Sequence, residues 1–207
     1  MSVVTFETGS DGIARIAVDR PDKRNAIDPA ARAALIEAFA AGLGDDAVTA
    51  IVIGSTDGNF CAGGDIDSMT GLDVGSARKR MKQNHLLVRL LAEAEKPVIA
   101  AVEGFAVGAG AGLALLADTI VLAEGGAIGF PFFRVGLTPD YGILFTLARR
   151  VGSARARQIL LYARMLKGRD ALDAGLADEL VADGAAETRA FELAAELAAQ
   201  PPHAFAL

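Results

Sequence analysis

The stretch AVEGFAVGAG, residues 101–110, decides the fold that the sequence predicts. It begins as an apolar strand and ends in a glycine-rich turn that leads into a helix. Gly108, Gly110 and Gly112 stand at the start of that helix. The first N–H groups of a helix have no partner within it and lie at the positive end of its dipole, so this turn suits an oxygen that gains negative charge.

The same glycines admit two other interpretations. A dinucleotide-binding turn needs a longer last interval than the one between Gly110 and Gly112, and an acidic residue at the end of a following strand. The spacing excludes that interpretation. Small residues also let a helix pack closely against a sheet without any ligand, and this purely structural interpretation stays open beside the anion site.

Two further stretches carry unusual residues after a predicted strand. They are RPDKRNAI, residues 20–27, and NFCAGGDI, residues 59–66. Gly63 and Gly64 remove side chains from the second stretch, so that its backbone N–H groups can approach a ligand closely. Loops that leave the carboxyl ends of parallel strands are where α/β proteins place ligands, so we expect all three stretches to meet in one crevice.

The hydrophobic pattern alternates between strand and helix along the chain. Apolar runs and period-2 segments predict strands, and apolar residues three and four apart predict helices. This order favours a parallel, layered α/β core. The strands are expected at 3–7, 13–18, 50–53, 98–102, 119–123 and near 180–181, and the helices at 28–42, 76–93 and 113–117 and in a last amphipathic segment through 191–197.

The composition is that of a soluble, cytoplasmic protein with one domain. The chain has 207 residues, of which 52% are hydrophobic, which allows a substantial core. Its single cysteine, Cys61, rules out an internal disulfide. We find neither a basic leader segment nor an apolar run of about 18 residues, so no signal peptide and no membrane span are expected. The net charge of -6 argues against a nucleic-acid partner, although small basic clusters at 20–24 and 78–82 suit a phosphorylated small molecule.

The three stretches, in this order and at these separations, resemble the enoyl-CoA hydratase/isomerase (crotonase) superfamily. The likeness continues through GLTPD, residues 136–140, and covers nearly the whole chain. It implies one crotonase-like domain over residues 1–207, a spiral of ββα units with a helical C-terminal part. It also implies an acyl-CoA thioester as partner, a homotrimer or dimer of trimers, and no metal and no cofactor apart from the coenzyme A of the substrate.

The resemblance assigns roles to particular residues. The N–H groups of Gly64 and Ala109 would form an oxyanion hole for the enolate of the thioester, where each donor is typically worth about 3 kcal/mol in the transition state. Basic residues in the first loop would lie near the phosphates of coenzyme A. The substrate contacts implied in this way are Lys23, Arg24, Ala26, Ala62, Asp65, Ile66, Gly108 and Phe132.

The sequence departs from the hydratases of this family at two places. Their two glutamates correspond here to Gly112 and Phe132, so hydration by paired carboxylates is disfavoured. Phe130, Phe132 and Phe133 would make that wall of the pocket apolar. Asp140 matches a position where isomerase-like and dehalogenase relatives carry a functional aspartate. A shift of a double bond needs only one such group, and burial would raise its pKa usefully.

Several alternatives stay open. Asp140 follows a proline at a helix start, where an aspartate often serves only the helix dipole. Hydration could use displaced carboxylates, for which Asp65, Asp67 and Glu103 are candidates. A relative that binds acyl-CoA without chemistry is a third possibility. A dehalogenase is disfavoured, because the chain has no tryptophan and His85 lies within a predicted helix. A serine hydrolase is disfavoured, because only His85 and His203 could act as bases and the serines at 55, 68 and 153 lie outside any nucleophile motif. A thiol nucleophile at Cys61 is also disfavoured.

The end of the sequence bears on assembly. The resemblance implies further C-terminal helices that complete trimer contacts, and the 207 residues given are expected not to include these trimerisation helices. The stretch PPHAFAL, residues 201–207, is therefore interpreted as a connecting segment.

Overall fold

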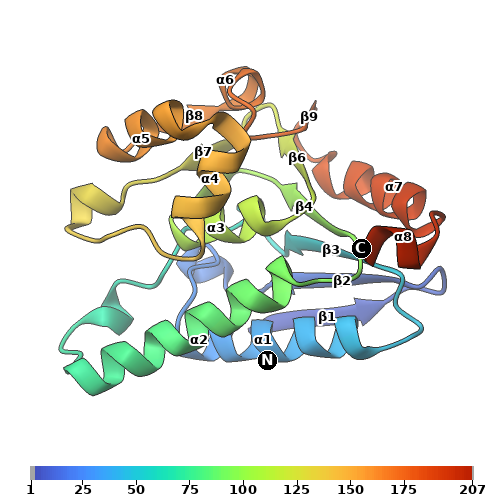
Figure 1. Cartoon of the computed structure of the whole chain (residues 1–207), viewed down its shortest axis with the longest axis horizontal. Coiled ribbons are helices and arrows are strands. Elements are labelled where there is room, and N and C mark those ends of the chain that lie inside the picture. The colour runs from blue at the N-terminus through green and yellow to red at the C-terminus, as the bar shows by residue number, and fades with distance from the viewer. Residues whose placement is uncertain (1–2, 207) are drawn as a thin grey trace.

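The larger of two β-sheets organises the protein, which a computed structural model describes over residues 3–206. Its strands stand in the order β1-β2-β3-β4-β6-β9, and every neighbouring pair is parallel except the β1–β2 hairpin (Figure 1). The expected parallel α/β core is thus confirmed. The strands are β1 (Val4–Thr8), β2 (Ile13–Val18), β3 (Ala50–Ser55), β4 (Val98–Val102), β6 (Thr119–Ala123) and β9 (Glu179–Val181).

A smaller sheet of three short strands stands beside the larger one. It comprises β5 (Phe105–Val107), β7 (Ala127–Gly129) and β8 (Met165–Lys167), in that order. The chain adds one strand to each sheet and then a helix: β4, β5 and α3 (Ala109–Leu116), followed by β6, β7 and α4 (Ile143–Val151). This repetition is the expected spiral of ββα units. The pattern of the sequence did not predict the small sheet.

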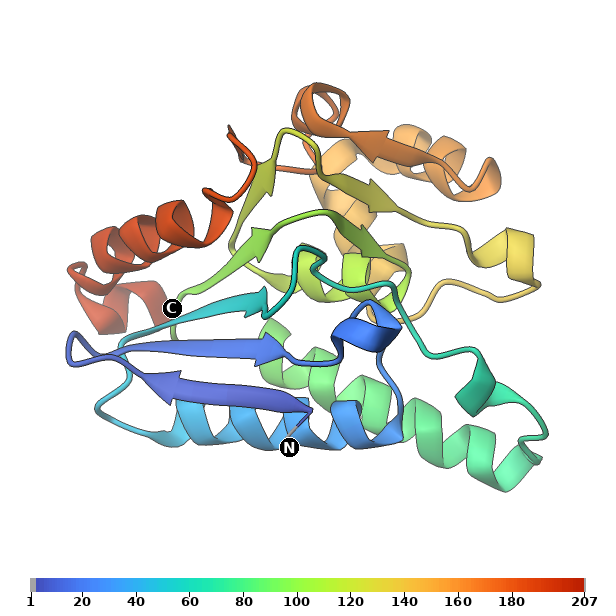
Figure 2. The ribbon, with the colours of Figure 1, turned by 180° about the vertical axis from the view of Figure 1, so that it is seen from behind.

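The larger sheet is buried on both faces, which explains its continuous apolar strands. Ile51 and Ile53 of β3 belong to the core that includes α1 (Pro29–Gly44) and α2 (Val74–Ala92). Val52 faces the other way, toward the alanines of α7 (Ala186–Ala198). In Figure 2, α1 runs below β1 and β2, α2 slopes up from the lower right, and α7 lies to the left of the strands.

Capping residues set the starts of the first two long helices. The Asp28 side chain accepts a hydrogen bond from the Ala31 N–H at 2.7 Å, with Pro29 in the first turn of α1. Asp73 caps α2 in the same way, so this helix begins two residues before the expected Ser76. The remaining elements are the 3-10 turns η1 (Pro21–Lys23), η2 (Asp67–Met69) and η3 (Phe132–Val135), and the helices α5 (Ser153–Leu161), α6 (Gly168–Asp173) and α8 (Pro202–Ala206).

The C-terminal segment ends in a short helix. Residues 202–206 form α8, and Leu207 lies outside the described residues. The final amphipathic helix is confirmed as α7. Over residues 3–206, no helix has the length and apolar character needed to cross a membrane.

Candidate functional site

The loop after β3 joins the glycine turn through backbone pairing. The Cys61 N–H donates to the Phe105 carbonyl at 2.9 Å, and the Val107 N–H donates back to the Cys61 carbonyl at 2.9 Å. Cys61 therefore forms an isolated parallel β-bridge with Ala106 of β5. Gly110 permits this approach, since a methyl group there would lie 2.6 Å from both the Cβ and the carbonyl oxygen of Cys61.

The first motif loop joins the same cluster. The Ala62 N–H donates to the Arg24 carbonyl at 3.0 Å, and the Ile27 N–H donates to the Gly63 carbonyl at 2.7 Å. The Asp65 N–H returns a hydrogen bond to the Ile27 carbonyl at 3.0 Å. The prediction that the three stretches meet in one place is therefore confirmed.

Two backbone N–H groups are left free where these loops meet. Among the hydrogen bonds of residues 3–206, none is donated by the N–H of Gly64 or of Ala109, the first residue of α3. Gly63, with φ of 101°, lies between them, and a methyl group on it would lie 3.6 Å from the Ala109 nitrogen. The residues that carry the two unpaired donors line the same cavity.

A cavity of about 330 Å³ opens in front of these donors. Its wall is mostly apolar, with Asp140 at one side and Arg80 at another. The residues of the predicted site that line it are Ala62, Gly64, Ile66, Gly108, Ala109, Phe132 and Asp140.

The other predicted contacts lie outside the wall of the cavity. Lys23 and Arg24 are exposed, and the Lys23 Nζ lies 3.7 Å from Asp67 Oδ2. The guanidinium of Arg20 donates a hydrogen bond to the Ala26 carbonyl, and its Nη2 lies 3.4 Å from Asp65 Oδ2. These residues hold the first two loops together beside the cavity, where only a ligand longer than the cavity could touch them.

Asp140 is held by a neighbour on α2. The Asn84 Nδ2 donates to Asp140 Oδ2 at 3.0 Å, and the Asn84 side chain is fully buried. Burial raises the pKa of the Asp140 carboxyl above its usual value, while the positive charge of Arg80 and the hydrogen bond from Asn84 oppose part of that rise. A carboxyl group with a raised pKa is suited to accept a proton and return it near neutral pH.

The displaced carboxylates named as alternatives do not reach the cavity. Asp65 is engaged by Arg20, and Asp67 is 88% exposed in its pair with Lys23. Glu103 accepts hydrogen bonds from two N–H groups at and just before the start of α7. Asp140 is the one carboxylate among residues 3–206 that lines the cavity.

The structure explains why Gly112 carries no side chain. A methyl group on Gly112 would lie 2.5 Å from the Cβ of Tyr141 and 3.0 Å from its carbonyl oxygen. A glutamate therefore has no room at this position without movement of the segment around Tyr141. The second glutamate position holds Phe132, which is 7% exposed and lines the cavity.

The expected wall of three phenylalanines is wrong in part. Phe132 lines the cavity, but Phe130 is fully buried in the core and Phe133 is 48% exposed. They differ because Phe130 precedes the 3-10 turn η3, whereas Phe132 and Phe133 are neighbours within it and their side chains point in different directions.

The surroundings of Cys61 and His85 do not favour a catalytic role for either residue. Burial raises the pKa of the Cys61 thiol to about 12, so the thiolate is not populated at neutral pH. His85 is exposed on α2. Neither residue lines the cavity.

Four site residues escaped the sequence reasoning: Met69, Arg80, Met81 and Asn84. Three of them line the cavity, and Asn84 lies behind it against Asp140. Asn84 carried a usable signal, because it falls three residues after Met81 and three before Leu87, on the apolar side of its helix. A polar residue in that stripe needs a buried partner.

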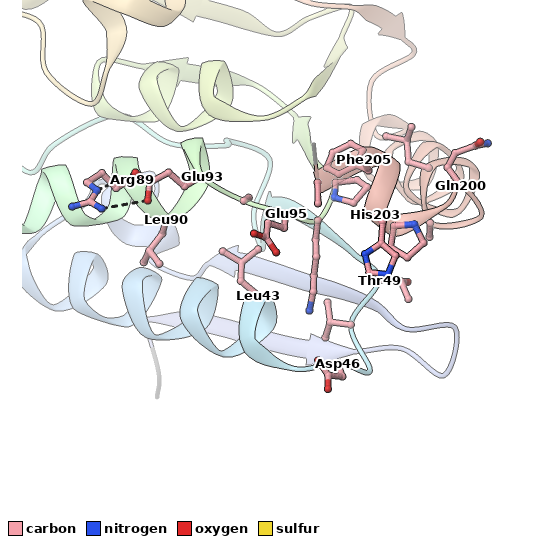
Figure 3. Close-up of a pocket in the computed structure, with 18 of the residues that line it drawn as sticks. Leu43, Asp46, Thr49, Arg89, Leu90, Glu93, Glu95, Gln200, His203 and Phe205 are labelled. Atoms are coloured by element: carbon pink, nitrogen blue, oxygen red, sulfur yellow. Dashed lines mark hydrogen bonds and ion pairs between the residues drawn. The ribbon is translucent and has the colours of Figure 1, made fainter.

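A larger cavity, of about 740 Å³, lies elsewhere (Figure 3). It is bordered by the end of α1, the end of α2 and the helices α7 and α8, with the Arg89–Glu93 ion pair on its rim. None of the motif residues lines it. The larger cavity therefore does not share the chemistry of the motif loops.

Comparison with known proteins agrees with this geometry. The family model described as enoyl-CoA hydratase/isomerase matches residues 8–207. A probable enoyl-CoA hydratase of Rhodobacter capsulatus is 36% identical over 197 residues, which are 95% of this chain and 76% of the relative. The 1,2-epoxyphenylacetyl-CoA isomerase of Escherichia coli is 34% identical over 196 residues, covering 92% of this chain and 74% of that enzyme.

A solved structure extends the likeness to the whole fold. The crystal structure of a putative enoyl-CoA hydratase/isomerase from Mycobacterium abscessus superposes with a TM-score of 0.93 at 31% identity, over 98% of this chain and 80% of the other. The cluster of motif loops, the ββα spiral and these matches together place the chain in the enoyl-CoA hydratase/isomerase family.

Proposed function

We propose that this protein shifts the double bond of an enoyl-CoA thioester by proton transfer through Asp140. One observation carries the proposal: Asp140 and the free N–H groups of Gly64 and Ala109 line one cavity. Proton transfer next to a thioester requires a base for the carbon acid and donors for the enolate oxygen. The cavity offers both, and no second carboxylate within the described chain faces it.

The reaction uses one group twice. With the thioester oxygen between the two N–H groups, Asp140 removes a proton from the carbon next to the thioester carbonyl. The electron pair of that C–H bond forms a C=C bond to the carbonyl carbon, and the π pair of the carbonyl moves onto the thioester oxygen. The dienolate then takes the proton back from Asp140 at another carbon, which restores the carboxylate. Atoms and electrons balance without a cofactor beyond the coenzyme A that the substrate carries.

The remaining part of the substrate has a matching surface. Lys23, Arg24 and Ala26 stand in the first loop, and Asp65 and Ile66 flank the second. The Lys23–Asp67 ion pair is exposed and therefore contributes little to stability. Lys23 can thus leave Asp67 and bind a phosphate of coenzyme A at a small cost in free energy. We propose these five residues together with Ala62 as contacts of the coenzyme A moiety, and Gly108 and Phe132 as walls around the acyl group.

The test is isomerisation of 3-enoyl-CoA to 2-enoyl-CoA by the wild-type protein and by Asp140→Asn. We expect turnover by the wild type and a loss of at least 100-fold in the variant, in line with the usual contribution of general acid–base catalysis, about 10² to 10⁴. Exchange of substrate protons in deuterated water should fall with it. Undiminished turnover in Asp140→Asn would exclude the mechanism, and acyl-CoA binding without any exchange in the wild type would indicate a non-catalytic relative.

Hydration is the second candidate, because the relative from Rhodobacter capsulatus is described as a probable enoyl-CoA hydratase. With no room for a glutamate at Gly112 and with Phe132 in the other position, water would have to be activated by Asp140 alone. Conversion of crotonyl-CoA to the 3-hydroxy product would decide for hydration. Its absence together with a double-bond shift would decide for the isomerase.

We also propose self-association, as a homotrimer or a dimer of trimers. Large apolar side chains are exposed on successive segments next to the cavity, and such a concentration marks protein interfaces. Sedimentation of the purified protein tests this, with a monomer as the contrary result. The exposed residues are Phe133, Val135, Leu137, Leu144, Phe145, Leu161, Tyr162 and Met165.

A further inference from the structure

Arg80 lines the cavity without an ion-pair partner among the described residues. It stands on α2, is about half buried, and makes one long hydrogen bond, from Nη1 to Ser68 Oγ at 3.4 Å. No ion pair joins it to a carboxylate within residues 3–206. A guanidinium has five N–H donors, and a partly buried one that lacks a carboxylate or phosphate partner can still accommodate such a ligand.

The guanidinium lies within reach of the reacting atoms. A methyl group on Gly64 would lie 3.1 Å from Arg80 Nη2, so the cation is close to the loop that offers the Gly64 N–H. The charge of Arg80 also acts on Asp140, whose pKa burial raises and Arg80 lowers. Arg80 therefore borders the space in which an acyl group would lie if its thioester oxygen were held by the Gly64 N–H.

A second arginine adds to the positive charge at this end of the cavity. Arg32 of α1 is 1% exposed, and its Nε and Nη2 have no hydrogen-bond partner. It lies near enough to affect Arg80: burial lowers the pKa of Arg80, and the charge of Arg32 lowers it further. Two carboxylates, Asp140 and Asp65, also act on Arg80 through their charge, but neither forms an ion pair with it, and Asp65 is paired with Arg20. The guanidinium of Arg80 is therefore left with room for an anionic ligand.

Asp140 compensates the charge of Arg80 only in part, because the two side chains act on each other through charge without forming an ion pair. Asp140 Oδ2 accepts a hydrogen bond from Asn84 at 3.0 Å. The rest of the wall near Arg80 is apolar, with Met69 and Met81 among its members. A volume of about 330 Å³ is at the lower end for ligand cavities, roughly 300–1,000 Å³, which favours a short acyl group.

We propose that Arg80 binds a carboxylate on the acyl chain, so that the preferred substrates are CoA thioesters of short unsaturated dicarboxylic acids. This inference rests on the proposed function for the reaction, but it concerns binding and can be tested separately. The carboxylate would sit beside the guanidinium, with the thioester oxygen at the Gly64 and Ala109 N–H groups and the carbons between them next to Asp140.

The experiment compares two unreactive ligands of equal chain length, glutaryl-CoA and pentanoyl-CoA, by calorimetry. We expect the wild type to bind glutaryl-CoA at least about 10-fold more tightly, the usual size of a charge-assisted hydrogen bond or more. Arg80→Gln should abolish this preference, and Arg80→Lys should keep part of it. Arg78→Gln is the matched control, since Arg78 is exposed two residues earlier on the same helix, and it should keep the full preference.

Equal affinity of the wild type for the two ligands would overturn the proposal, and this result needs no variant to fold. Equal weakening of both ligands in Arg80→Gln would also overturn it, because Arg80 would then serve the coenzyme A phosphates or the cavity in general. If the protein prefers glutaryl-CoA but exchanges no protons in the CoA thioester of the unsaturated dicarboxylic acid, the carboxylate site at Arg80 is supported and the isomerase is refuted. If it exchanges protons but shows no preference for glutaryl-CoA, the isomerase is supported and the carboxylate site is refuted.

Discussion

Replacing Asn84 with alanine removes the side-chain donor that holds Asp140. The bond from Asn84 Nδ2 to Asp140 Oδ2 is 3.0 Å long, and the Asn84 side chain is fully buried, so water does not readily replace it. A hydrogen bond to a charged group contributes about 1.5–3 kcal/mol. If the variant loses this full free energy in the transition state, kcat/KM for the double-bond shift falls by about 10- to 150-fold.

The pH profile distinguishes positioning from simple damage. Asn84 donates to the ionised carboxylate and so lowers the pKa of Asp140, in opposition to burial. Its loss raises that pKa, and the acidic limb of kcat/KM moves to higher pH. Asn84→Asp keeps the shape of the side chain but adds a like charge, so it should move the limb in the same direction.

His85→Gln is the control, because His85 is exposed beside Asn84 on the same helix and its loss should leave the profile in place. The assay is initial rate against pH for the wild type and the three variants, with folding checked by circular dichroism. An acidic limb that stays at the wild-type pH in both Asn84 variants would refute the assignment of Asn84 as the residue that positions Asp140.

Two further predictions concern stability. Gly110→Ala should destabilise the protein by about 1–3 kcal/mol in urea unfolding, because the new methyl group would lie 2.6 Å from Cys61 atoms, whereas Gly44→Ala, with nothing within 4 Å, should change it little. An equal effect of the two changes would contradict the close packing. Asp140→Asn should be more stable than the wild type at neutral pH. Burial raises the pKa of Asp140 in the folded protein above its value in the unfolded chain. The contribution of protonated Asp140 to the free energy of unfolding is therefore fully present below the unfolded-state pKa and is lost as pH rises through the folded-state pKa, whereas asparagine stays uncharged. The advantage should vanish in acid, and a variant less stable than the wild type at neutral pH would show that ionised Asp140 is stabilising.

Much of the fold could be predicted because its causes are local. Asp28 and Pro29 mark the start of α1 on their own, and the apolar run of β3 marks a strand that is covered on both faces. The three-residue strands β5 and β7 could not be found in this way, because they are too short to show a period. They exist because the chain pairs them with each other across some twenty residues.

The candidate site divides along the same line. In the sequence, the glycines at 63, 64, 108 and 110 marked two stretches of accessible backbone, and the resemblance to the family singled out the N–H groups of Gly64 and Ala109 as the predicted donors. The same resemblance pointed to Asp140 and to the loss of the two glutamates. Only the tertiary structure decided which charges meet. Asn84, Arg80 and Arg32 come from two helices and reach Asp140 through packing between segments far apart in the sequence, whereas Asp65 and Glu103 are drawn to other partners. The physical reason is that a hydrogen bond or a desolvated charge depends on three-dimensional distance and burial, which no local pattern of residues encodes.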